Sequence, residues 1–328
     1  MTSQNLPIPQ FFDRSKMSSI WKVPYEQRIQ DALEWKKQYN ITDAEQDSFK
    51  VRFVLIDCLN SFCVPTGELY VNGAVEDNIR LCKYIYENLT NINSFTLSLE
   101  GHSPFSIFFE TFWVSENNTN PTPGTMISAD DVRNGVWGVN KSLRNLFSFK
   151  DGDLQDYALD YVETLEKTGK YQLTIWPLHG LEGSIGNSVV SSVEETVLFH
   201  STVRNSVPYY ETKGSSQLTE SYSMFGPEVT DVKNIDLIEN ILTSNDMVIF
   251  AGQAASHCVT SSIMSIWDTI KDSTPSLANN VFILKDCMSS VKIPGVIDFT
   301  EQTEKFFKEF ESFGMNIITT ETPIYKLV

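Results

Sequence analysis

Short runs of β-branched and aromatic residues alternate with longer amphipathic stretches from residue 51 onward. This alternation is typical of βαβ units, which form a parallel sheet. Seven apolar runs predict strands, at residues 52–57, 94–99, 171–176, 206–211, 247–252, 281–286 and 316–321. We therefore predict a three-layer α/β fold, in which a doubly wound, mainly parallel sheet of about six or seven strands has helices on both faces.

Two of the amphipathic stretches repeat an apolar side chain every three or four residues, which is the spacing of one helix face. Residues 301–313 form such a stripe with Phe306, Phe310 and Phe313. Residues 74–89 form the other, which consists of Val75, Ile79, Cys82, Ile85 and Leu89. We predict that both segments are helices whose apolar stripes pack in the core.

Two segments interrupt the alternation of strands and helices. Residues 1–50 contain prolines, one helix-like stretch and no strand, so we predict an N-terminal extension. Residues 105–170 contain the turn-rich sequence SENNTNPTPGT and then the helical pattern DLQDYALDYVETLEK. We predict that this segment is an insertion near one end of the sheet, within a domain that spans residues 51–328.

Charge and composition restrict the partners of the protein. The 328 residues are 41% hydrophobic with a formal net charge of -17, and their 25 basic residues form no block. Binding to phosphates needs such a block, so we expect small-molecule partners and no nucleic acid. No run approaches the ~18 apolar residues of a membrane span, and the first residues lack the apolar core of a signal peptide. We therefore expect no membrane, a cytoplasmic location and reduced thiols at the five scattered cysteines.

Ionisable side chains follow the predicted strands at the points where the strands end. In an open α/β sheet, ligands bind beyond the carboxyl ends of the strands, so these side chains are expected to share one rim. They are Asp57, Glu100, His102, His179, Lys213 and Cys258. Each alone has an ordinary alternative, because a lone cysteine is usually a small buried side chain and a lone histidine is usually a core or loop residue.

Four ordered segments resemble those of the isochorismatase-like cysteine hydrolases, and most closely the nicotinamidases among them. DCLNSF, followed by TGELYVNGAVEDN, resembles the aspartate segment of that superfamily, and YETKGSSQLTESYSMF resembles its lysine segment. WPLHGLEGSIG resembles its Trp-Pro-x-His segment, and GQAASHCV resembles its nucleophile segment. The resemblance extends from about residue 53 to about residue 290, and the insertion interrupts it.

The resemblance implies a catalytic triad of Asp57, Lys213 and Cys258. A cysteine at a helix start beside a lysine is expected to be a good nucleophile, and Asp57 is expected to transfer its proton. The resemblance also implies a cis peptide bond at Gln253-Ala254, with backbone donors at Ala254 and Cys258 for the oxyanion. Phe62 and Trp176 match positions that flank a flat substrate ring, although an aromatic residue beside a strand end is commonly part of the core.

A divalent metal site is the next implication of the resemblance. The nicotinamidases hold their ion with Asp-x-His and a later histidine, which correspond here to Glu100, His102 and His179. Glutamate stands in place of the aspartate, so this chain either keeps the metal in a shifted position or lacks it. We expect zinc, with iron or manganese as alternatives.

Three functions remain open from the sequence. The first is an amidohydrolase that converts nicotinamide, or a related small aromatic amide, to the acid and ammonia through a thioester. The second keeps the triad but acts on a carbamoyl or ureido amide, because Glu100 and the insertion depart from the nicotinamidase pattern. The third is a non-catalytic binding protein on the same scaffold, against which the complete triad argues. A homo-oligomer is compatible with all three.

Overall fold

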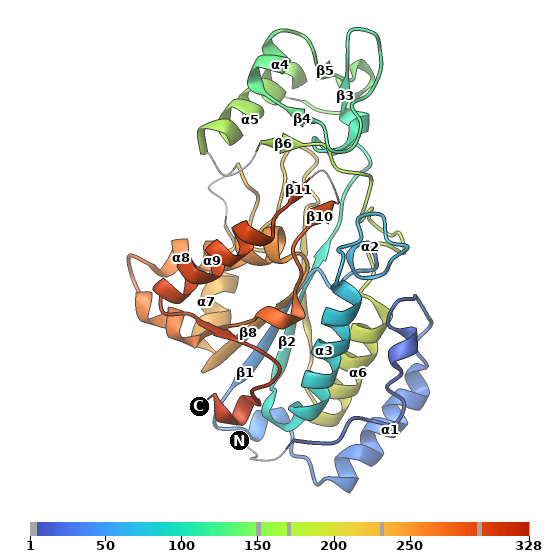
Figure 1. Ribbon diagram of the computed structural model, residues 1–328, viewed down its shortest axis with the longest axis vertical. Helices are drawn as coiled ribbons and strands as arrows, with labels where there is room; N and C mark the ends of the chain where they lie inside the picture. The colour runs from blue at the N-terminus through green and yellow to red at the C-terminus, as the bar shows by residue number, and fades with distance from the viewer. Residues whose placement is uncertain (1–4, 149–151, 169–171, 230–232, 294–296, 328) are drawn as a thin grey trace.

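A six-stranded parallel sheet forms the centre of the computed structural model, which describes residues 5–148, 152–168, 172–229, 233–293 and 297–327 (Figure 1). All neighbouring strands in it are parallel. In spatial order, they are β12 (Asn316–Ile318), β9 (Val281–Leu284), β8 (Met247–Gly252), β1 (Val51–Ile56), β2 (Ser94–Glu100) and β7 (Tyr209–Lys213).

The chain winds outward from β1 in both directions, which confirms the predicted doubly wound fold. From β1 it proceeds through β2 to the edge strand β7, and it then returns to β8 on the other side of β1. The strand order therefore reverses between β1 and β8, where such sheets bind their ligands. The register pairs Ile56 with Gly252, so Asp57 and the segment that leads to Cys258 leave the sheet side by side.

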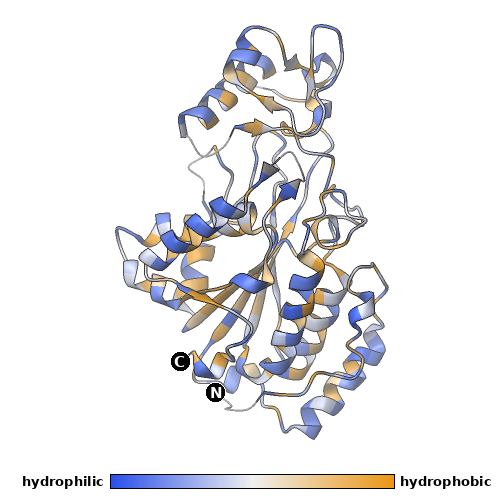
Figure 2. Cartoon of the chain, in the orientation of Figure 1, coloured by the Kyte–Doolittle hydropathy of each residue, from blue (hydrophilic) through white to orange (hydrophobic). Residues whose placement is uncertain are grey.

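Helices cover both faces of the sheet, as the figures show. On one face lie α3 (Ala74–Glu87) and α6 (Ser191–Arg204), and on the other lie α7 (Ile235–Thr243), α8 (Thr260–Ile270) and α9 (Thr300–Ser312). Neighbouring strand residues point to opposite faces. Accordingly, Phe53 and Leu55 belong to the first hydrophobic cluster, whereas Val54 and Ile56 belong to the second. Figure 2 shows the strands as mostly hydrophobic and the outer sides of the helices as mixed or polar.

A third hydrophobic cluster forms a small lobe beyond the carboxyl ends of the strands (Figure 1). Its buried members lie between Ile107 and Ile175, and the helices among them are α4 (Ala129–Arg133) and α5 (Leu154–Thr168). Its two small antiparallel pairs are β3 (Trp113–Val114) with β5 (Gly138–Val139) and β4 (Met126–Ile127) with β6 (Leu173–Thr174). The predicted insertion thus has its own core; its limits, and those of the domain, stay predictions.

The strand predicted at 171–176 is wrong as a strand of the central sheet. Tyr171 lies outside the described residues, and β6 holds two residues that pair with β4 in the lobe. Leu173 and Ile175 are apolar because they are buried in the lobe's own cluster. The strand predicted at 206–211 is shifted, since β7 begins at Tyr209 and ends at Lys213.

The N-terminal extension packs along α6. Its helix α1 (Tyr25–Gln38) is tied to α6 by an ion pair between Arg28 and Glu195, with 2.7 Å between Nε and Oε1. Phe11 packs against Tyr86 and Phe199. Two short elements, α2 (Asn60–Cys63) and the pair β10 (Lys292–Ile293) with β11 (Ile297–Asp298), lie near the carboxyl ends of the strands. None of the described helices is both long and apolar enough to span a bilayer.

Candidate active site

Asp57 follows β1 directly and is completely buried. Its backbone has a positive φ of 43°, a region that side chains other than glycine rarely occupy and that is enriched at functional sites. Ser98 of β2 holds it twice: the Ser98 hydroxyl donates to Oδ1 at 2.6 Å and accepts from the Asp57 amide at 2.9 Å. These two bonds fix the carboxylate, with Oδ2 turned toward Lys213.

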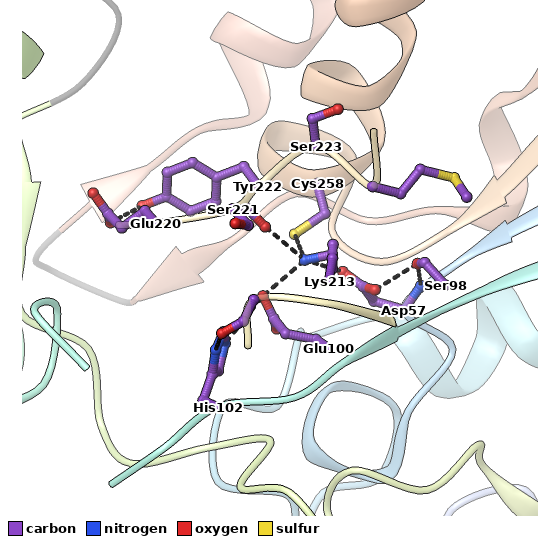
Figure 3. A network of polar contacts seen from close by, with 12 residues as sticks. Asp57, Ser98, Glu100, His102, Lys213, Glu220, Ser221, Tyr222, Ser223 and Cys258 are labelled. Carbon is purple, nitrogen blue, oxygen red and sulfur yellow. Dashed lines mark hydrogen bonds and ion pairs between the residues drawn. The ribbon is translucent and has the colours of Figure 1, made fainter. Parts of the chain in front are cut away.

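Lys213 ends β7 and lies at the centre of the polar cluster (Figure 3). Its Nζ is 2.9 Å from Oδ2 of Asp57 and 2.8 Å from Oε1 of Glu100, and it donates to the Ser221 carbonyl at 3.0 Å. The Sγ atom of Cys258 is 3.6 Å from the same nitrogen. One buried ammonium group therefore contacts all the charged or reactive groups at the end of the pocket.

Gly214, directly after β7, allows the end of this strand to lie against the His102 ring. It has a positive φ of 82°, and a Cβ atom there would lie 2.5 Å from the His102 ring. Only glycine fits such a position without displacing that ring. Lys213 and Gly214 thus bring the ammonium group and the His102 ring close together.

Cys258 lies in a π-helical turn, Ala255–Val259, that leads into α8. Single π turns inside helices are frequent at functional sites. Burial raises the pKa of the Cys258 thiol well above its ordinary value; Lys213 opposes this shift, and Asp57 and Glu100 add to it. The expected effect of Lys213 on the thiol is thus present, but burial outweighs it. The thiol must lose its proton during the attack.

The two charged partners of Cys258 are suited to that transfer. Burial raises the pKa of Asp57, against the opposing effect of Lys213. Burial alone would lower the pKa of Lys213, but Asp57, Cys258 and Glu100 together hold it well above its ordinary value. Asp57 is therefore a stronger base than a free aspartate, while Lys213 stays positively charged beside it.

Glu100, His102 and His179 come together at the pocket, with one possible ligand atom of each within 4.8 Å of the others. Nε2 of His102 lies 3.3 Å from Oε1 of Glu100, and Nε2 of His179 lies 3.6 Å from Oε2. The pKa of Glu100, which burial alone would raise, is held well below its ordinary value by Lys213 and His102. The carboxylate is thus ionised, as a metal ligand must be.

The donor atoms of this trio fit a divalent cation. Nδ1 of His102 contacts the Gly214 carbonyl at 3.0 Å, and Nδ1 of His179 contacts the Pro177 carbonyl at 2.7 Å. A carbonyl only accepts, so Nδ1 carries the proton in each neutral ring and the Nε2 lone pairs face Glu100. Within the described residues, Oε2 of Glu100 is also buried without a hydrogen bond. A cation among these atoms would satisfy all of them.

A pocket of about 520 Å³, including its open mouth, connects the metal-ligand trio with Cys258. The residues with predicted roles that line it are Phe62, Glu100, His102, Trp176, His179, Ala254 and Cys258. The peptide bond between Gln253 and Ala254 is cis, as the resemblance implied. Asp57 and Lys213 lie directly behind Cys258 and Glu100.

No family model matches the chain, and no curated protein matches it in sequence. Solved structures do match it in fold. The yeast nicotinamidase Pnc1p bound to the inhibitor nicotinaldehyde is 14% identical, with a TM-score of 0.52 over 82% of this chain and 99% of that one. The nicotinamidase and pyrazinamidase of Acinetobacter baumanii is 15% identical, with a TM-score of 0.52 over 84% and 99%.

The chain has the nicotinamidase fold. The resemblance to the isochorismatase-like superfamily, which four sequence segments predicted, is confirmed at the level of the fold. The inserted lobe adds to the pocket of this fold near its two ends in sequence, because Phe108 of its cluster and Trp176, which packs against that cluster, line the pocket.

Three residues of the candidate site were missed from the sequence. Ser98, which fixes Asp57, left a usable signal, because polar and apolar residues alternate along β2. The polar residues of the strand therefore share one face; they are Ser94, Thr96, Ser98 and Glu100. Glu220 and Tyr222 lie in a loop without periodicity, and although both fall within the segment that resembles the lysine segment, no role was assigned to either. Both line the pocket, and Glu220 is buried there.

Proposed function

We propose that this protein is an amidohydrolase that converts nicotinamide, or a related small aromatic amide, to the acid and ammonia with Cys258 as the nucleophile. The observation that carries the proposal is the position of the Lys213 ammonium, 2.9 Å from Asp57 and 3.6 Å from the thiol of Cys258, at the wall of a pocket lined by aromatic rings. A nucleophile, a base and a fixed charge that converge on one cavity support covalent amide chemistry.

The first half of the reaction forms the thioester. The Cys258 sulfur attacks the amide carbonyl while Asp57 takes the thiol proton, and Lys213 stabilises the negative charge that develops near the sulfur. Asp57 then gives that proton to the amide nitrogen, so the carbon–nitrogen bond breaks and ammonia leaves. Backbone donors at Ala254 and Cys258 are assigned to the oxyanion.

The second half regenerates the thiol. A water molecule attacks the thioester carbonyl, and Asp57 takes one of its protons. The carbon–sulfur bond breaks, the acid is released, and the proton held by Asp57 returns to Cys258. Ser98 keeps Asp57 in place through both halves because it bonds the carboxylate and the amide of that residue.

Glu100, His102 and His179 are the residues that would hold a divalent metal ion, with zinc as the first choice and iron or manganese as alternatives. When bound, the ion supplies a Lewis acid that coordinates a ring nitrogen of the substrate or a water molecule. The rings of Phe62 and Trp176 orient a flat substrate in the same pocket.

A second candidate is hydrolysis of a carbamoyl or ureido amide by the same triad. Glu100 favours it, because a glutamate stands where the nicotinamidase pattern has the shorter aspartate. A substrate without a ring nitrogen has no use for a metal that binds one. Metal content therefore bears on the choice between the two candidates.

Ammonia release from nicotinamide, benzamide and a carbamoyl amino acid tests the proposal, with bound metal measured by elemental analysis. We expect release from an aromatic amide, and expect Cys258→Ala to abolish it. Nicotinaldehyde is the matched probe, since an aldehyde forms a reversible adduct with a thiol, and the wild type but not Cys258→Ala should bind it covalently. Ammonia release by folded Cys258→Ala at the wild-type rate, or none from any amide by metal-loaded wild type, refutes the proposal.

A further inference from the structure

Glu220 places a second carboxyl group in the wall of the pocket, apart from the triad. Its side chain is 2% exposed and lines the same cavity as Cys258. Figure 3 shows Glu220 and Tyr222 on the opposite side of Cys258 from Asp57. Lys213 pairs with Asp57 and Glu100, and no ion pair joins Glu220 to a lysine, arginine or histidine of the described residues. The ionised form of Glu220 thus has no cationic protein partner there.

Two tyrosines hold this carboxyl group in a fixed orientation. The Tyr222 hydroxyl donates to Oε1 at 2.7 Å, and it accepts from Trp176 Nε1 at 3.1 Å. The Tyr161 hydroxyl lies 3.3 Å from Oε2 and accepts from the Glu220 amide at 2.9 Å. Tyr161 is buried in α5 of the inserted lobe, so the lobe itself sets the position of Glu220.

The environment of Glu220 favours a cationic or donating ligand group. Burial raises the pKa of Glu220 to about 8, and the negative charge of Glu228 adds to the shift. Glu220 is therefore mostly protonated at neutral pH, and a ligand cation beside it would favour the ionised carboxylate. A carboxyl group has about four acceptor positions, and the two tyrosine hydroxyls use two of them. The other carboxylate of the cavity, Glu100, already pairs with Lys213, and most of the remaining lining side chains are apolar or aromatic. A ligand N–H group would therefore find its partner at Glu220.

We propose that Glu220 is a specificity-determining residue that binds a positively charged or hydrogen-bond-donating group of the substrate, remote from the amide carbonyl, and that Tyr161 positions it. The substrate class is thus a small aromatic amide with an amino or similar N–H group at its far end. This inference rests on the proposed function, because the orientation assumes that the amide carbonyl meets Cys258.

A matched pair of amides tests the inference. 3-(Aminomethyl)benzamide carries an ammonium group where 3-ethylbenzamide has a methyl group of similar size. We expect wild type to prefer the amine by about tenfold to hundredfold in kcat/KM, the range for a hydrogen bond to a charged group. Glu220→Gln, which keeps an acceptor for Tyr222, should lose that preference. Equal use of both amides by wild type overturns the inference.

A binding measurement separates this inference from the proposed function. Calorimetry of both amides on Cys258→Ala needs no turnover, so the preference for the amine is expected even if neither amide is hydrolysed. Zinc content is measured on the same samples, and Glu220→Gln should hold as much zinc as wild type. Loss of zinc would make Glu220 a metal ligand and overturn its assigned role.

Tyr161→Phe tests the positioning step, with Tyr157→Phe as the matched control. Tyr157 lies one turn earlier on α5, and its hydroxyl donates to the Leu218 carbonyl. We expect Tyr161→Phe to raise KM for the amine severalfold, with little change for 3-ethylbenzamide, whereas Tyr157→Phe keeps the wild-type ratio. A uniform loss on both substrates in Tyr161→Phe would indicate a purely structural tyrosine and overturn the positioning role.

Discussion

Cys258 differs from the other cysteines because its sulfur can be reached from the pocket, and not because its thiol has a low pKa. All five cysteines lie in the described part of the chain, and the other four are at most 2% exposed, whereas Cys258 is 7% exposed and lines the open pocket. Burial raises the thiol pKa at all five. Reactivity therefore depends on whether a reagent can reach the sulfur.

Brief iodoacetamide treatment of the native protein is expected to alkylate Cys258 first, because reagent enters the pocket but not the core. Peptide mass spectrometry after a time course identifies the modified residue, and activity is measured on the same samples. Activity should fall in parallel with modification of Cys258. Faster labelling of Cys58 or Cys287 with activity intact would contradict the nucleophile assignment.

Asp57 and Lys213 are predicted to be essential to turnover but unequal in their effect on stability. Asp57→Asn keeps its size and loses the proton-transfer step, so activity should fall by ~10²-fold or more in a folded protein. Lys213→Ala should abolish activity too. It also leaves Asp57 and Glu100 buried without their cation, which costs about 3–5 kcal/mol of unfolding free energy.

Denaturant titration and kinetics on both variants test this difference. Ser98→Ala is the matched control for position: it frees the Asp57 carboxylate without removing it, so activity should lie between that of wild type and Asp57→Asn. A fully active Asp57→Asn enzyme would remove that residue from the mechanism.

At the scale of elements, the sequence predicted what is periodic and missed what depends on tertiary context. The run at 247–252 became β8 residue for residue, because both its faces are buried. The run at 171–176 also contains β-branched and aromatic residues, but its buried members Leu173 and Ile175 belong to the core of the lobe. Nothing local shows which of the two cores an apolar run joins. On α9, Phe310 is fully buried as predicted, but Phe307 is buried beside it and Phe306 only partly. An apolar stripe in the sequence therefore predicts which face of a helix is buried to within about one residue.

The candidate site shows the same difference between what the sequence predicts and what depends on tertiary context. Residues at strand ends could be predicted, because parallel strands bring their carboxyl ends to one edge. His179 lies at the predicted edge, although the run before it is not a strand of the central sheet. Its segment returns from the lobe to the sheet, where a β-bridge joins His102 and Leu181. Glu220 and Tyr161 could not be predicted, since only the folded lobe brings them together.

The N-terminal extension is predicted to stabilise the fold without taking part in catalysis. Phe11 packs on Tyr86 and Phe199, and the Arg28 guanidinium lies 3.9 Å from the centre of its ring. Phe11→Ala should therefore lower the unfolding free energy by about 1–3 kcal/mol, by loss of aromatic packing. The kcat/KM is expected to stay at the wild-type value, because no described residue of the extension lines the pocket. A large loss of activity in the folded variant would contradict this separation.

At the scale of the whole molecule, the metal-ligand trio joins the lobe to the sheet. Glu100 is the last residue of β2 and His102 follows the strand, whereas His179 lies on the segment that returns from the lobe. An ion bound by all three would therefore stabilise the contact between the two parts as well as the pocket. Metal that binds only the folded state raises stability with metal concentration.

Thermal unfolding with and without zinc measures this coupling. The metal-stripped wild type is expected to gain about 4 kcal/mol at zinc concentrations a thousandfold above Kd, which shifts Tm upward by several degrees. His179→Ala should bind less zinc and lose most of that shift. His257→Gln should retain it, since His257 lines the pocket outside the trio. An equal shift in wild type and His179→Ala would mean that the zinc responsible binds elsewhere, and the metal assignment of Glu100, His102 and His179 would fall with it.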